Sequence, residues 1–134
     1  MAVIGTRAAL AVQHASRGTR RVSEVLDVAP TESFEVGDDD ARGSRTREHS
    51  HWALDSPVDG DLEDQLRALV DRFLPQREAL ELLRLEGYRL AWTCYVEEGD
   101  GDGAVALPSD LLRDLGALPV DLWIDSYADT PSTA

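Results

Sequence analysis

Two nearby stretches of sequence decide the fold class. Residues 61–74 read DLEDQLRALVDRFL, and residues 88–97 read YRLAWTCYVE. In the first stretch the apolar residues recur three and four positions apart, which predicts a helix with one apolar stripe. In the second stretch apolar and polar residues alternate, which predicts a strand with one buried face. A long amphipathic helix close to an alternating strand indicates an α+β domain.

The residues around the first stretch predict the ends of its helix. Asp59 or Asp61 should cap the start, because a carboxylate accepts hydrogen bonds from the first free amides of a helix. Pro75 should end or kink the helix, and it suits the first position of a second helix over residues 76–86. Gly87 is then a natural residue after the C-terminus of that helix.

The chain before residue 61 predicts further strands and a long loop. Residues 2–13 alternate as a strand, and Thr19 is expected to cap a short helix. Residues 33–36 and 52–54 have the pattern of short strands. Between them, residues 37–51 are rich in Gly, Asp and Ser, which predicts a long surface loop. A loop of this length in a compact domain is either mobile or functional.

The chain after residue 97 completes the predicted sheet. A turn at 98–103 and a short strand at 104–107 should form a hairpin with the 88–97 strand. Pro108 should start a helix, and residues 120–125 alternate as a last strand. The whole order predicts a mixed or antiparallel sheet with helices on one face, and it is compatible with a ferredoxin-like arrangement.

Length and charge place the chain among globular domains. Its 134 residues fit one domain over residues 1–128, followed by a frayed tail at 129–134. The formal net charge is -13, and all 13 basic residues are arginine, a usage typical of a GC-rich bacterial genome. So negative a field repels nucleic acid and anionic lipid. We therefore expect no nucleic acid and no membrane as partners, and we expect a basic protein as the partner.

Cysteine usage and hydropathy indicate a cytoplasmic protein. Cys94 is the only cysteine, which excludes an internal disulfide and a cysteine-based zinc site. The N-terminus lacks the pattern of a signal peptide, and no window reaches the roughly 18 apolar residues that a membrane span needs. The same pattern leaves the oligomeric state open.

The long loop carries the strongest candidate site. Three arginines in an acidic chain could hold a phosphate or a carboxylate, since a guanidinium binds such groups in a bidentate manner. The competing interpretation is local neutralisation of the aspartates at 38–40. Exposed loops often carry function. The candidate ligand-binding residues are Arg42, Arg45, Arg47, His49, His51 and Trp52.

Metal and cofactor motifs are weak in this sequence. His49 and His51, next to Glu48, could be two metal ligands, but two histidines at this spacing are common by chance. Residues 100–103 read DGDG, which fits a hairpin turn better than a calcium loop. The sequence therefore indicates no metal and no cofactor.

Catalytic groups are also weakly indicated. Cys94 falls on the apolar face of its predicted strand, so core packing is favoured over a nucleophile. Asp125 and Tyr127 could form an acid–base pair, but such residues equally often end a strand. We therefore expect no enzyme activity. The three tryptophans all fall in strand patterns and are expected in the core rather than at a ligand: Trp52, Trp92 and Trp123.

Several short motifs together resemble the DUF4279 family of small bacterial domains. The motifs lie at 25–31 (VLDVAPT), 36–38 (VGD), 52–54 (WAL), 61–74, 107–112 (LPSDLL) and 123–127 (WIDSY). The resemblance covers about residues 4–127, and Asp27 stands where the family often has glycine. It implies the fold and leaves the function open, because the family carries no accepted catalytic residues.

Two function classes follow from these observations. The favoured hypothesis is a non-catalytic binding or interaction module, and a specific version is an immunity protein that neutralises a basic toxin by charge complementarity. The alternative is a domain that binds a small anionic ligand or a metal with the 38–51 loop.

Overall fold

The computed structural model describes residues 5–40, 42–98 and 105–128. In chain order their elements are β1 (Arg7–His14), α1 (Arg20–Leu26), β2 (Glu32–Phe34), β3 (Ser50–Asp55), α2 (Leu62–Phe73), the 3-10 turn η1 (Leu74–Gln76), α3 (Arg77–Leu85), β4 (Arg89–Glu98), α4 (Ser109–Gly116) and β5 (Asp121–Ala128). These elements confirm the predicted α+β fold class.

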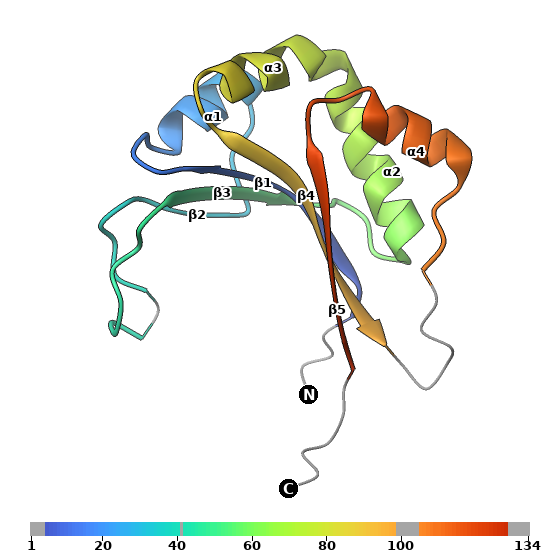
Figure 1. Cartoon of the computed structure of the whole chain (residues 1–134), viewed down its shortest axis with the longest axis horizontal. Coiled ribbons are helices and arrows are strands. Elements are labelled where there is room, and N and C mark those ends of the chain that lie inside the picture. Colours follow the sequence, from blue (N-terminus) through green and yellow to red (C-terminus); the bar gives the residue numbers. More distant parts are fainter. Residues whose placement is uncertain (1–4, 41, 99–104, 129–134) are drawn as a thin grey trace, which may run out of the picture.

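The strands form one mixed sheet in the order β2-β3-β1-β4-β5. All neighbouring pairs are antiparallel except β4 and β5, which are parallel. β1 and β2 therefore run in the same direction with β3 between them. This is the split βαβ arrangement of a ferredoxin-like fold, which α4 and β5 extend at one edge. The helices cover a single face of the sheet, as predicted (Figure 1).

The hydrophobic core lies between this face and the helices. Strand alternation sends every second residue of β1 and β4 into it, as the sequence predicts. The apolar stripe of α2 packs against them, and each such fully buried side chain contributes about 1.5–3 kcal/mol to folding. Cys94 lies in this core, where burial raises the pKa of its thiol to about 12. The thiol is therefore protonated and packs as a small apolar group.

Local signals place the ends of the two central helices. Asp61 caps α2, because its carboxylate accepts a hydrogen bond from the Asp64 amide at 2.9 Å. Pro75 lies in the tight turn between α2 and α3. Gly87 follows α3 with a φ of 94°, a left-handed conformation that glycine adopts without strain.

Two predictions about local structure are wrong. Residues 105–107 form no strand, because both edges of β4 are already paired, one with β1 and the other with β5. Thr19 stands at the N-cap of α1, but its hydroxyl donates to the Glu35 carboxylate instead of capping the helix. Of the turn predicted at 98–103, Glu98 is the last residue of β4, and residues 99–103 lie outside the described residues, as does the tail at 129–134. No helix in the described ranges is long and apolar enough to cross a membrane.

The end of α1 provides a test of backbone strain. Asp27 follows α1 with a φ of 55°, and its amide donates to the Ser23 carbonyl. A Cβ is crowded in this left-handed conformation. Asp27→Gly should therefore raise the free energy of unfolding by about 0.5 kcal/mol in urea titrations. Asp27→Ala, which keeps the Cβ, is the control. An equal gain in the alanine variant would contradict the backbone explanation.

Candidate functional site

No helix of the described ranges lies on the second face of the sheet (Figure 1). Strand register aligns its outward residues in rows that cross the sheet. One row runs from β2 to β5 through Glu32, Ala53, Ala11, Ala91 and Asp121. The next row runs from β3 to β5 through Asp55, Ala9, Thr93 and Trp123. We call this surface the open face.

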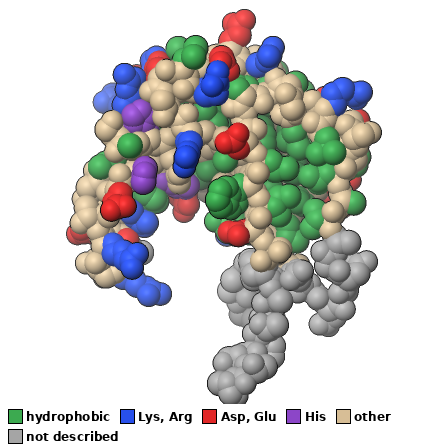
Figure 2. Space-filling view, in the orientation of Figure 1, with side chains coloured by type: hydrophobic (Ala, Val, Ile, Leu, Met, Phe, Trp, Pro, Cys, Tyr) green, Lys and Arg blue, Asp and Glu red, His purple; other side chains and the backbone are tan. Residues whose placement is uncertain are grey.

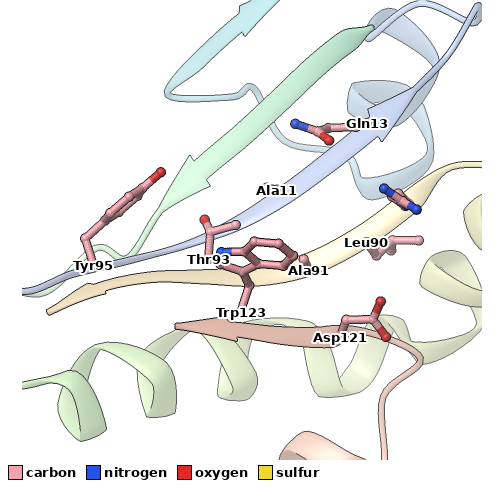
Figure 3. A pocket seen from close by; sticks show the side chains of 9 residues that line it. Ala11, Gln13, Leu90, Ala91, Thr93, Tyr95, Asp121 and Trp123 are labelled. Atoms are coloured by element: carbon pink, nitrogen blue, oxygen red, sulfur yellow. The ribbon is translucent and has the colours of Figure 1, made fainter. Parts of the chain in front are cut away.

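The open face contains a pocket of about 410 Å³. Small-molecule sites and side-chain pockets typically begin at roughly 300 Å³. Alanines at the centre of the sheet form its floor, because their short side chains leave the space above them open. Larger side chains stand around this floor (Figure 3). The lining residues are Ala11, Gln13, Arg89, Leu90, Ala91, Thr93, Tyr95, Asp121 and Trp123.

The Trp123 side chain lines the pocket and is 64% exposed. The expectation that all three tryptophans lie in the core is therefore wrong for this one. Its neighbours Leu122 and Ile124 share the register of the core-facing Trp92 and Cys94, so alternation turns Trp123 to the open face. Tyr95 of β4 also lines the pocket and is 46% exposed.

The charges around the pocket divide between its two ends. Asp121 and Asp125 flank Trp123 along β5, and neither carboxylate belongs to an ion pair within the described ranges. Arg89 lies in the row of Gln13, on the other side of the alanine row. The Asp55 carboxylate is already paired with the Arg7 guanidinium at 3.2 Å. The β5 end of the pocket is therefore acidic.

The predicted loop is a hairpin-like excursion between β2 and β3, which we call the arginine hairpin (residues 37–40 and 42–49). The Gly37 amide donates to the Arg47 carbonyl, and the Arg47 amide donates to the Asp38 carbonyl. The hairpin extends to the side of the open face, and a hollow separates it from β5 (Figures 1 and 2). Arginine side chains gather at its far end (Figure 2).

Asp40 holds the turn of this hairpin. Its carboxylate accepts hydrogen bonds from the Arg42 and Ser44 amides, both at 3.0 Å. Desolvation raises the pKa of Asp40, but the amides of Ser44 and Arg42 outweigh it, so the pKa lies below its usual value. Within the described residues none of the three hairpin arginines forms an ion pair with the neighbouring aspartates.

A stack of side chains connects the hairpin to the pocket. The Arg47 guanidinium lies 4.0 Å from the centre of the Phe34 ring, and the His51 ring stacks on Phe34 with centroids 5.0 Å apart. Gln13 donates to His51 Nδ1 at 2.9 Å and lines the pocket. Burial lowers the pKa of His51 despite the nearby Glu32 carboxylate. His51 is therefore a neutral imidazole, which packs against Phe34 and accepts the hydrogen bond of Gln13.

The chain matches the family model described as Domain of unknown function (DUF4279) over residues 6–129. It belongs to this family. A search of curated proteins found no match, and neither did a search of solved structures. The resemblance in the sequence is thereby confirmed, and the DUF4279 domain spans the whole sheet, the arginine hairpin and the open face.

The six predicted ligand-binding residues lie in three separate places in the DUF4279 domain. Arg42, Arg45 and His49 are exposed on the hairpin. Arg47 and His51 both contact Phe34, with His51 inside β3 and not in the loop. Trp52 faces the helices, fully buried, and its indole nitrogen donates to Ser23 Oγ at 3.0 Å. It contributes nothing to the hollow.

The sequence alone does not identify the pocket itself. Tyr95, Arg89 and Asp121 belong to the polar halves of the two alternating stretches, at 88–97 and 120–125, and the sequence gives no sign that they meet. The signal that could have found them is the same alternation: helices on one face leave the polar face of every strand open. No group of three or more His, Cys, Asp or Glu side chains in the described part of the domain is arranged to hold a metal ion.

The exposure of Trp123 can be measured in solution. Acrylamide should quench its fluorescence, whereas the buried Trp52 and Trp92 should be protected. Trp123→Phe should remove the quenchable component of the emission. Trp123→Ala should change the free energy of unfolding by no more than about 0.5 kcal/mol, since it removes few core contacts. Truncating the buried Trp92 should instead cost about 3–5 kcal/mol. Equal losses in the two alanine variants would contradict the placement.

Proposed function

We propose that this DUF4279 domain is a non-catalytic interaction module that binds a basic protein through its open face. The observation that carries the proposal is the exposed Trp123, which lines a pocket and lies between Asp121 and Asp125 on β5, two carboxylates with no ion-pair partner among the described residues. Exposed aromatic side chains in a pocket are typical anchors of protein interfaces, where a few central residues supply most of the binding energy.

The charge of the chain supports a basic partner. The formal net charge is -13, which attracts cationic surfaces over a distance of about one Debye length. Complementary charge raises the association rate and selects among partners more than it raises affinity. A pocket at the acidic end of the open face would then supply the short-range contacts that hold the partner.

The chemistry of the pocket supports a role without catalysis. Its polar side chains are Gln13, Arg89, Thr93, Tyr95 and Asp121, and the described ones include no nucleophile hydrogen-bonded to a base. Such a pair is the usual requirement for acid–base or covalent catalysis. The single cysteine is buried away from the pocket with a raised pKa.

A specific form of this proposal is an immunity protein that covers a basic toxin. A small acidic domain can block a cationic active site by lying over it, and the concave open face suits a protruding segment of such an enzyme. This form predicts that the neighbouring gene encodes a basic protein. The general proposal does not depend on it.

The proposal is tested by capture from a lysate of the source organism at low salt. Four immobilised baits are compared: the wild type, Trp123→Ala, Asp121→Asn/Asp125→Asn, and the control Asp71→Asn/Glu78→Gln. The control removes the same two charges from exposed positions on α2 and α3. We expect a protein of high isoelectric point that the wild type and control retain and that both open-face variants lose. Retention that is equal on all four baits, or no retention, would contradict the proposal.

A second candidate function is anion binding by the arginine hairpin. Arg42 and Arg45 are exposed without an ion-pair partner among the described residues, and Arg47 Nε is buried without an acceptor. An open depression of about 660 Å³ adjoins this region, with Asp40 and Glu48 also at its edge. Two carboxylates at the edge weaken an anion site, so this function ranks second.

Inorganic phosphate is the probe for the second candidate function. An anion is tested rather than a metal ion, because the described ranges contain no group of side chains arranged to bind a metal. If the hairpin binds anions, phosphate should raise the melting temperature above that in chloride of equal ionic strength. Arg42→Gln/Arg45→Gln should abolish the increase. Arg77→Gln/Arg113→Gln, which removes two exposed helix arginines, should keep it. An unchanged melting temperature in phosphate would exclude this function.

A further inference from the structure

We infer that the β5 end of the pocket is a subsite for one cationic side chain, a guanidinium or an ammonium group, contributed by the partner. This inference rests on the proposed function and names the chemistry of its central contact. The cation would lie on the face of Trp123, between the carboxylates of Asp121 and Asp125.

The register of β4 and β5 places the necessary groups together. Trp123 pairs with Thr93, and both side chains line the pocket (Figure 3). Asp125 pairs with Tyr95 in the next row of the open face, and Asp121 pairs with Ala91 in the row before. The indole of Trp123 therefore lies in the middle of a row of outward residues on β5, with one carboxylate two residues before it and another two residues after it, and with Tyr95 beside the second. A cation gains from both the ring quadrupole and the carboxylates.

The open face already holds one contact of this kind. On this face, the Arg47 guanidinium lies 4.0 Å from the centre of the Phe34 ring. A second contact lies in α2, where the Arg72 guanidinium is 5.8 Å from the centre of the Phe73 ring. No guanidinium from the described residues lies on Trp123, although an indole is the strongest of the aromatic faces for a cation. Among the described residues, this indole face therefore has no cation of its own and can receive one from a partner.

The internal cations do not compete for this subsite. Arg7 lies in the row of Tyr95, but its guanidinium is paired with Asp55 at 3.2 Å. Arg89 lies in the row next to that of Asp121 and two rows from that of Trp123, and it forms no ion pair with Asp121 within the described structure. The arginine hairpin lies on the opposite side of the hollow (Figure 2). A partner cation is therefore directed to Trp123, where the charge is negative.

Charge also decides among the alternative occupants. A second copy of this chain would bring another net charge of -13 to the acidic edge, and like charges across an interface cost binding energy. An anionic ligand would meet the same two carboxylates. A basic segment meets neither obstacle, so the observations favour it over both.

The test is an NMR titration of the full-length domain at low salt. The probe is N-acetyl-L-arginine amide, and its matched control is the uncharged isostere N-acetyl-L-citrulline amide. We expect arginine, and not citrulline, to shift the amides of residues 93–95 and 121–125. Asp121→Asn/Asp125→Asn should weaken the arginine effect about threefold to fivefold, and Trp123→Ala should do the same. Asp71→Asn/Glu78→Gln should leave it unchanged.

Three results would overturn the inference. They are equal shifts with citrulline, an arginine effect that Asp121→Asn/Asp125→Asn does not weaken, and a dimer in sedimentation that Trp123→Ala dissociates. If arginine fails while partner capture still depends on the open face, the subsite alone is wrong. If arginine succeeds while capture is equal on all baits, the proposed function is wrong and the subsite holds. The two failures are therefore distinguishable.

Discussion

The packing of α2 against the alternating residues of β1 and β4 is the contact on which the rest of the structure depends. Leu66, Leu69 and Phe73 of α2 share one buried cluster with Leu10 and Trp92, and residues of α1, α3 and α4 complete this core on the same side of the sheet. The two central strands must then send every second residue away from the helices. The open face is the necessary consequence of a core built on one side of the sheet, and its character is set by the residues left over.

The outward-facing residues of the sheet are of two kinds, and their distribution determines the shape of the hollow. At the centre of the sheet they are alanines, and Ala11 and Ala53 are nearly buried although no helix covers them. At β5 and on the hairpin they are large or charged. Short side chains in the middle and long ones at both sides produce a concave surface without any bend in the chain. A pocket formed in this way is rigid at its floor, because the floor is the hydrogen-bonded centre of the sheet.

Much of this fold could be predicted from the sequence, because local periodicity depends on neighbours in the chain. The stripe in α2, the alternation of β4 and the placement of Cys94 all follow from spacing alone, whereas the sequence offered both Asp59 and Asp61 as the cap of α2. The partners of β4 could not be predicted in the same way. A hairpin with residues 104–107 satisfied every local rule, but α4 carries the chain back to place β5 at that edge instead. The expectation that Trp123 lies in the core is wrong for the same reason. Alternation shows that Trp123 and Leu122 point to opposite faces of the sheet, but the position of the helices decides which face is buried.

The candidate site follows the same division between local and long-range information. The arginine hairpin is visible in the sequence because its composition is unusual, whereas the stack of Arg47, Phe34 and His51 arises from three separate segments. This stack joins the hairpin to the wall of the pocket through Gln13, so the two candidate surfaces are parts of one concave face. The hairpin carries three arginines together with four carboxylates, whereas the β5 edge carries Asp121 and Asp125 beside Trp123. The concave face therefore has mixed charge at the hairpin and negative charge at β5. Under the proposed function, the β5 edge is the part of this face that favours a basic partner, because its carboxylates have no nearby guanidinium partner among the described residues.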